Sequence, residues 1–281
     1  YIVCESWLND KSTNETRGQM LSLYMIISMG GLGIGQMMIS TGAENSMALF
    51  ILASVLVSIA VVPVLLSATG APNFEEPERM SVRRLLQVSP LAVIGLGLNG
   101  VAVSMLFGMG AVYGLSIGLD SSEVGYFMTA PVVGALILQY PVGRLSDRFD
   151  RRIVIMGVAV MGGIAAGLAT LFGKAEFALL LVCMLIYGGS LFPLYSLCIA
   201  HANDFLTPRQ MVAAASGLVM VNGGGAVLGS PLAALSIEFL GIGSFFVMIT
   251  GLQALIAAFA LYRMSQRAAV PNEAQLSLIH I

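Results

Sequence analysis

The sequence predicts an all-α integral membrane protein with eight transmembrane helices joined by short loops. Three observations predict this class: an apolar composition, eight long uncharged segments, and basic residues that gather on one side of the predicted membrane. Of the 281 residues, 57% are hydrophobic and 10% are charged, against about 25% charged residues in an ordinary soluble domain. So few charges could not cover a soluble protein, whereas a surface that faces lipid requires none. The composition therefore excludes a soluble enzyme.

Eight segments are long enough to cross a bilayer. A spanning helix requires about 20 mostly apolar residues, and none of these segments contains Lys, Arg, Asp or Glu in its interior. Each is predicted to be helical because an isolated strand cannot satisfy its backbone polar groups in lipid. A closed barrel is excluded because the segments lack alternation of apolar and polar residues. They are residues 18–39, 47–66, 91–117, 124–142, 153–172, 177–200, 211–235 and 243–262.

Residues 67–89 form the longest connection and carry prolines and charges of both signs. This composition predicts a linker between two helical bundles. Residues 1–66 would then be the remainder of an N-terminal bundle, and residues 90–264 a complete six-helix C-terminal bundle. Residues 265–281 read as a polar tail, whose last six residues resemble a cloning junction rather than native sequence.

The basic residues predict the orientation. If every segment crosses the membrane, twelve of the 13 Lys and Arg residues lie on one side and only Lys174 lies on the other. This asymmetry follows the positive-inside rule. We therefore expect a multi-pass protein of the bacterial inner membrane, with loops 67–89 and 143–152 in the cytoplasm.

An internal repeat predicts two related halves. Asn9-Asp10, Arg17 and a glycine-rich helix recur as Asn203-Asp204, Arg209 and a second glycine-rich helix. The two arginines are about 192 residues apart, and six spans separate the copies. Parallel repeats of this kind are typical of carriers built from two pseudo-symmetric six-helix halves. By this logic about 100 residues, enough for four spans, precede Tyr1.

Residues 143–152 read GRLSDRFDRR and resemble the signature loop G-x-L-a-D-r-x-G-r-r of the major facilitator superfamily, with Asp150 in the place of a glycine. Segments 5–9, 124–128 and 139–143 are similar to a small bacterial YcaD-like subgroup of this family. The resemblance implies the major facilitator fold, with eight of its twelve helices present. It also implies alternating access, with a small-molecule substrate bound near the membrane midplane between the bundles.

The same resemblance implies a gate at the cytoplasmic side, in which Asp147 latches onto the start of the 18–39 helix in the opposite bundle. The alternative is that the arginines only set the topology and bind anionic lipid. The residues of the predicted gate are Gly143, Arg144, Asp147, Arg148, Arg151, Arg152, Arg17 and Gly18.

Polar residues within apolar spans are candidates for a substrate cavity, and bonding between helices is the alternative interpretation. They are Asn99, Asn222, Tyr187, Tyr195 and Gln36. No carboxylate lies deep in the eight segments. A proton-coupled mechanism would therefore use Glu5 or His201 at the helix ends, or a residue in the preceding helices.

Glycines four residues apart predict close helix packing. The pairs are Gly31 and Gly35, Gly110 and Gly114, Gly163 and Gly167, and Gly225 and Gly229.

The function favoured by these observations is secondary active transport of a small organic solute, with proton coupling as an option. One alternative is a membrane sensor or scaffold that keeps a transporter fold and moves nothing, and another is a membrane enzyme. We expect a monomer that needs no cofactor or metal, because the three cysteines lack the paired spacing of metal or redox sites. No basic patch is large enough to suggest a nucleic-acid partner.

Overall fold

The computed structural model describes residues 17–39, 47–66, 80–172 and 174–266. Helices form at all eight predicted segments, and no strand occurs in these ranges, which confirms the all-α prediction. The elements are α2 (Arg17–Ile39), α3 (Ala48–Leu66), α4 (Val82–Val88), α5 (Pro90–Ser116), α6 (Ser121–Arg148), α7 (Arg151–Ala169), the short η1 (Lys174–Glu176), α8 (Phe177–Asn203), α9 (Pro208–Leu240) and α10 (Ser244–Gln266).

Six of these helices, α5 to α10, are long and apolar enough to cross a membrane. The 23-residue α2 and the apolar stretch Ala48–Pro63 of α3 occupy the other two predicted positions. The helix boundaries differ from the prediction by a few residues at several ends, and two differences matter for the site. Helix α6 runs on to Arg148, and the short helix α4 lies inside the predicted linker, capped by the Ser81 hydroxyl, which accepts a bond from the Arg84 N–H.

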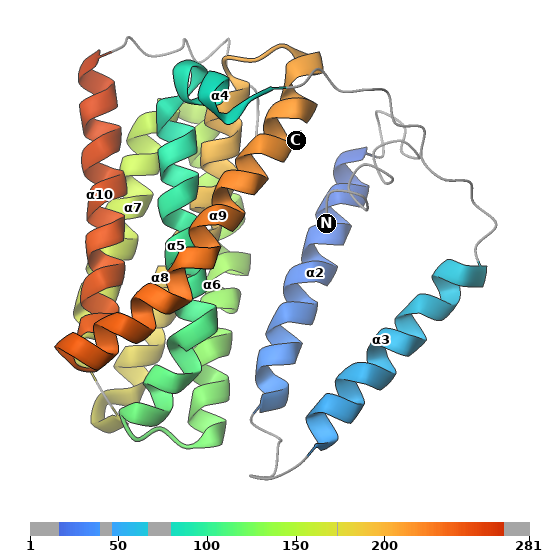
Figure 1. The fold of residues 1–281 in the computed structure, drawn as a ribbon, viewed down its shortest axis with the longest axis vertical. Coiled ribbons are helices and arrows are strands. Elements are labelled where there is room, and N and C mark those ends of the chain that lie inside the picture. Colours follow the sequence, from blue (N-terminus) through green and yellow to red (C-terminus); the bar gives the residue numbers. More distant parts are fainter. Residues whose placement is uncertain (1–16, 40–46, 67–79, 173, 267–281) are drawn as a thin grey trace.

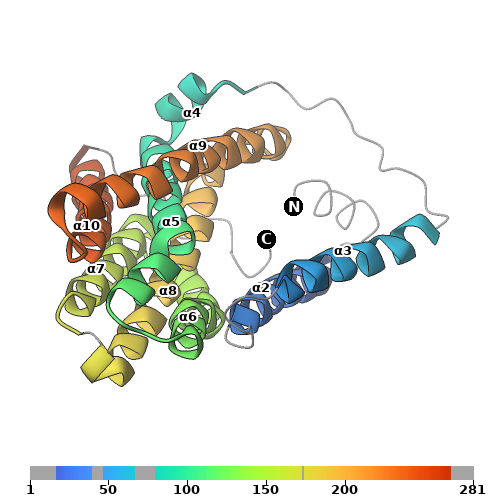
Figure 2. The same ribbon diagram turned by 60° about the horizontal axis from the view of Figure 1, so that its bottom comes forward.

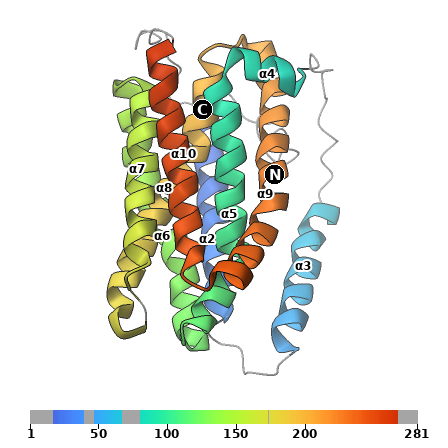
Figure 3. The ribbon, with the colours of Figure 1, turned by 60° about the vertical axis from the view of Figure 1, so that its left-hand side comes forward.

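Helices α5 to α10 form one bundle, with α4 across one end (Figures 1 and 3). Within it α5 packs on α9, α6 packs on α8, and α7 packs on both α8 and α10. Helix α2 lies antiparallel to α6 and in contact with it, while α3 lies on the far side of α2 (Figures 1 and 2). The α2–α6 contact is thus where the segment before the linker meets the bundle that follows it.

Close packing of α5 on α9 relies on small residues. A Cβ atom on Gly225 would overlap the Gly97 carbonyl oxygen, and one on Gly229 would overlap the carbonyl oxygen of Val101. The hydroxyls of Ser104 and Ser230 bond across the same interface at 2.8 Å. This is how helices associate in lipid, where no hydrophobic effect drives them together. The prediction of glycine packing is confirmed for Gly225 and Gly229.

Two apolar clusters fill the bundle. The cluster away from α4 contains stacked and edge-on rings of Tyr113, Phe127, Phe245 and Phe246. The cluster beneath α4 includes Leu85, the buried anchor of that short helix. The start of α6 is fixed by a capping box, in which Asp120 accepts the N–H of Glu123 and Glu123 accepts that of Asp120, both at 2.9 Å. The basic signature segment lies at the opposite end of α6, beside α4.

Candidate functional site

The signature segment is helical over most of its length. Helix α6 ends at Arg148 and α7 begins at Arg151, so Phe149 and Asp150 are the whole connection. The expected loop over 143–152 is therefore wrong in its extent. Phe149 is extended and its N–H bonds to the Leu145 carbonyl. Asp150 has a negative φ of −52° and caps α7 by accepting the Arg152 N–H at 3.0 Å. Aspartate is a favoured capping residue, which accounts for its presence where the signature has glycine.

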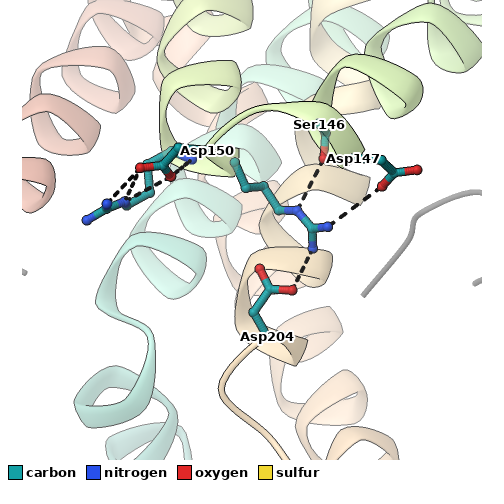
Figure 4. A network of polar contacts seen from close by, with 6 residues as sticks. Ser146, Asp147, Asp150 and Asp204 are labelled. Carbon is teal, nitrogen blue, oxygen red and sulfur yellow. Dashed lines mark hydrogen bonds and ion pairs between the residues drawn. The ribbon is translucent and has the colours of Figure 1, made fainter. Parts of the chain in front are cut away.

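Arg151 is the centre of a buried polar cluster that joins three helices (Figure 4). It is 1% exposed. Its guanidinium donates to the Ser146 hydroxyl of α6 at 3.2 Å and to the carboxylate of Asp204, just after α8, at 3.0 Å. A longer contact of 3.8 Å joins it to Asp147. A buried cation is tolerated only when it is paired and hydrogen-bonded, so Asp204 is essential to this position.

Arg152 makes a local pair instead. Its side chain donates to both carboxylate oxygens of Asp150, the shortest bond being 2.7 Å. Burial opposes ionisation of Asp150, but the hydrogen bonds from Arg152 outweigh it and leave the pKa of Asp150 below its ordinary value, with a smaller contribution from the charge of His201. His201 itself is buried in the last turn of α8, with its ring edge-on to Phe205 at 5.2 Å between ring centroids.

The predicted gate residues thus divide into two groups. Arg151 and Arg152 are buried, whereas Arg144 and Arg148 are exposed. Asp147 lies between these groups, with its side chain 15% exposed. Gly143 is partly exposed, and a Cβ there would meet nothing within 4 Å.

Arg17 and Gly18 open helix α2, but their side-chain environment lies outside what the structure describes, as does Glu5. The helical register nevertheless gives the level of these two residues along the α2–α6 pair. A Cβ on Gly33 would lie 3.5 Å from Val132 Cγ1, which puts these residues at one level of the antiparallel pair. Fifteen residues lead from Gly33 back to Gly18, and fifteen lead from Val132 forward to Asp147. Since each residue advances a helix by about 1.5 Å, both paths cover about 22 Å toward the same end. Gly18 and Asp147 therefore lie at a similar level.

The predicted cavity residues are found in different surroundings. Asn99 and Tyr187 are buried within the C-terminal bundle, and the side-chain amide of Asn99 lacks a hydrogen-bond partner among the described residues. Asn222 donates to the Leu96 carbonyl of α5 at 3.0 Å and so ties α9 to α5. Tyr195 and Gln36 are partly exposed.

Comparison with known proteins decides the family. The model of the Major Facilitator Superfamily matches residues 92–279. The chain belongs to the major facilitator superfamily. An uncharacterized MFS-type transporter named YcaD from Escherichia fergusonii is 26% identical over 254 residues, which cover 89% of this chain and 64% of that protein. An uncharacterized MFS-type transporter of Enterobacter sp. (strain 638) is 28% identical over the same shares. The chain thus spans 64% of the length of these relatives.

The same fold occurs in a solved facilitator. The E. coli fucose:proton symporter FucP matches 93% of this chain and 72% of its own, with a TM-score of 0.57 and 13% sequence identity. This likeness confirms the predicted facilitator fold. Because the family and the matched relatives are transporters, the interpretation as a membrane enzyme is set aside, and the chain is a multi-pass membrane protein of a transporter family.

The sequence analysis did not identify two members of the polar cluster around Arg151, namely Ser146 and Asp204. In the sequence, Asp204 stands out only as part of the internal repeat. One signal could have identified it, namely a carboxylate placed directly after an apolar helix, on the side that carries nearly all the arginines. Ser146 gave no such signal, because a serine inside a basic segment is common and only the packing of Arg151 against it makes it part of the cluster.

Proposed function

We propose that this chain belongs to a secondary active transporter that moves a small organic solute across the bacterial inner membrane by alternating access. In this proposal the α4 end of the bundle is cytoplasmic and the α2–α6 contact is the gate. One observation carries the gate proposal: Asp147 is level with the first turn of α2 and next to Arg151, a cation that cannot leave its site.

The first turn of a helix attracts a carboxylate because its N–H groups lack partners within the helix and carry the positive end of the helix dipole. Asp147 would engage that turn when the cytoplasmic side is closed. When the bundles separate there, Asp147 loses that partner, and Arg151 at 3.8 Å is positioned to compensate its charge. Arg151 remains in place throughout because Asp204, whose side chain is only 2% exposed, holds it. In this proposal the contact of Asp147 with the first turn of α2 stabilises the closed state, and on opening Asp147 exchanges it for Arg151.

The gate is tested by Asp147→Asn, which removes the charge and preserves the shape. Spin labels at Tyr24→Cys in α2 and Arg263→Cys in α10 report the separation of the two segments at the α4 end, through double electron–electron resonance. A carboxylate at a helix N-terminus contributes about 1 kcal/mol, so the ratio of closed to open populations should fall about fivefold. The experiment requires no knowledge of the substrate.

Asp150→Asn is the matched control, because Asp150 is three residues away and is paired with Arg152 of its own helix. It should leave the distance distribution unchanged. The proposal is rejected if Asp147→Asn also leaves the distribution unchanged, or if both variants shift it equally, because the effect would then belong to the arginine-rich segment in general.

The proposed sidedness rests on the arginines around α4 and at the α6–α7 connection, with Lys174 of η1 at the other end. Two reporter fusions test it. A phosphatase fused after Gly118, in the turn between α5 and α6, should be active because it would lie in the periplasm, whereas one fused after Gln266 should be inactive. The reverse result would invert the gate and remove the argument for a cytoplasmic latch.

A further inference from the structure

A groove of about 540 Å³ lies between α2 and α6, on the part of their interface far from Asp147. Three methionines of α2, Met29, Met37 and Met38, form much of one wall. The other wall consists of the side chains of α6 from Thr129 to Leu136. Its volume falls in the range of small-molecule sites, about 300–1,000 Å³.

Glycines make the groove possible. In the α5–α9 interface glycine allows two backbones to touch, but a Cβ on Gly30 would meet nothing within 4 Å and one on Gly33 would only reach an ordinary contact with Val132. The space that larger side chains would occupy at these two glycines of α2 therefore stays open and forms part of the groove. Gly31 and Gly35 lie outside the groove lining, and a Cβ on either would meet no atom of another described element within 4 Å, so the described residues show no glycine packing for this pair.

Among the described residues that line the groove, none is charged and few can form hydrogen bonds. The one hydroxyl among them, that of Thr129, already donates to the Gly125 carbonyl of its own helix at 2.7 Å. A charged or strongly polar solute would lose its hydration here without compensation, whereas an apolar solute would gain from burial. Methionine side chains are flexible and polarizable and adapt to ligands of different shape.

We propose that this groove binds the transported solute and that the solute is an uncharged, lipophilic small molecule. This inference rests on the proposed function, because it places the substrate between the two segments whose separation the Asp147 gate controls. The groove and the gate lie about 22 Å apart along the same pair of helices, so a solute can occupy the groove while the α4 end is closed.

Benzophenone is a suitable probe because it is uncharged, is smaller than the groove, and on illumination inserts into C–H bonds, with methionine as a preferred target. The full chain is placed in phospholipid nanodiscs and labelled at increasing benzophenone concentration, and mass spectrometry measures the label on each methionine. Labelling of Met29, Met37 and Met38 should saturate. Met220 of α9, which is 64% exposed, reports labelling from the lipid phase and should rise in proportion to concentration.

Gly30→Phe should fill the groove and reduce labelling of the three methionines at least fivefold. Gly31→Phe is the matched control, because Gly31 also has open space around it but does not line the groove. Should Gly30→Phe fail to fold by circular dichroism, Leu136→Trp fills the groove from the other wall. The anionic analogue 4-benzoylbenzoate should label the groove at least fivefold less than benzophenone does.

Two results would overturn the inference. Labelling of the groove methionines that rises without saturation, as at Met220, would mean that the groove is only a lipid-facing surface. Equal labelling by the anionic analogue would reject the lipophilic class. Neither result depends on the gate. Unsaturable labelling together with a shift in Asp147→Asn would retain the gate and reject the groove as a binding site. Saturable labelling without a shift in Asp147→Asn would retain the site and reject the gate.

Discussion

The α5–α9 and α2–α6 interfaces use the same residue type in opposite ways. In the first, glycines bring backbones into contact, and serine and asparagine side chains bond across it. In the second, glycines border an open groove, and Gly33 makes only an ordinary contact with its neighbour. The difference supports the proposed gate, because close backbone packing would hold α5 and α9 together, whereas the looser α2–α6 contact would separate more readily.

The largest expected effect within the bundle comes from Asp204→Asn. It leaves Arg151 buried without its closest carboxylate, and such a loss costs about 3–5 kcal/mol. Thermal unfolding in detergent should show a clearly lower midpoint. Glu123→Gln at the far end of α6 is the control, because glutamine preserves the capping box. The apolar double variant Arg151→Met with Asp204→Leu should recover most of the loss; no recovery would show that the cost came from packing rather than charge.

Gly225→Ala and Gly33→Ala compare the two interfaces directly. The first places a Cβ against the Gly97 carbonyl and should cost about 1–3 kcal/mol through overpacking. The second places a Cβ at 3.5 Å from Val132 Cγ1 and should cost nothing measurable. Unfolding midpoints of the two variants in the same detergent test the contrast, and similar losses would show that the α2–α6 interface is packed as tightly as the interior.

Ser230→Ala should have a smaller effect. It removes the 2.8 Å bond to the Ser104 hydroxyl and the 3.0 Å bond to the Ser104 carbonyl. Bonds between membrane helices contribute about 0.6 kcal/mol on average. Ser116→Ala is the control, because that hydroxyl bonds to the Val112 carbonyl of its own helix and to no other described residue. If the two variants unfold alike, the serine bridge does not hold α9 to α5.

The smallest effect on stability is expected from lowering the pH. The pKa of Asp150 lies below its ordinary value of 3.8 because of its bonds to Arg152. A depressed pKa in the folded protein means that the carboxylate stabilises the fold above pH 3.8 and that this contribution is lost as the pH falls through the lowered value. The stability difference between the wild type and Asp150→Asn should therefore be constant from pH 7 to pH 5. A difference that shrinks in this interval would show that the pKa is raised.

The sequence alone was sufficient for the eight long apolar helices, the family and the position of the signature segment, but not for the short helix α4. These follow from length, hydrophobicity and motif, which are local properties. The environments of the four arginines in that segment were not predictable in this way. Arg148 and Arg151 are three residues apart and chemically identical, but only the second faces α8 and Asp204. Likewise Gly33 and Gly225 look alike in sequence, and only the distance to a neighbouring helix determines whether glycine closes an interface or leaves a groove.

The connection of only two residues between α6 and α7 has a mechanical consequence. Because Arg151 is bonded to both Ser146 and Asp204, the ends of α6, α7 and α8 are joined with almost no slack. In the proposed transport cycle, a displacement of α6 at Asp147 would therefore not be absorbed by stretching a loop and would be passed on to α8. The signature segment would then act as a stiff coupling between the proposed gate and the rest of the bundle.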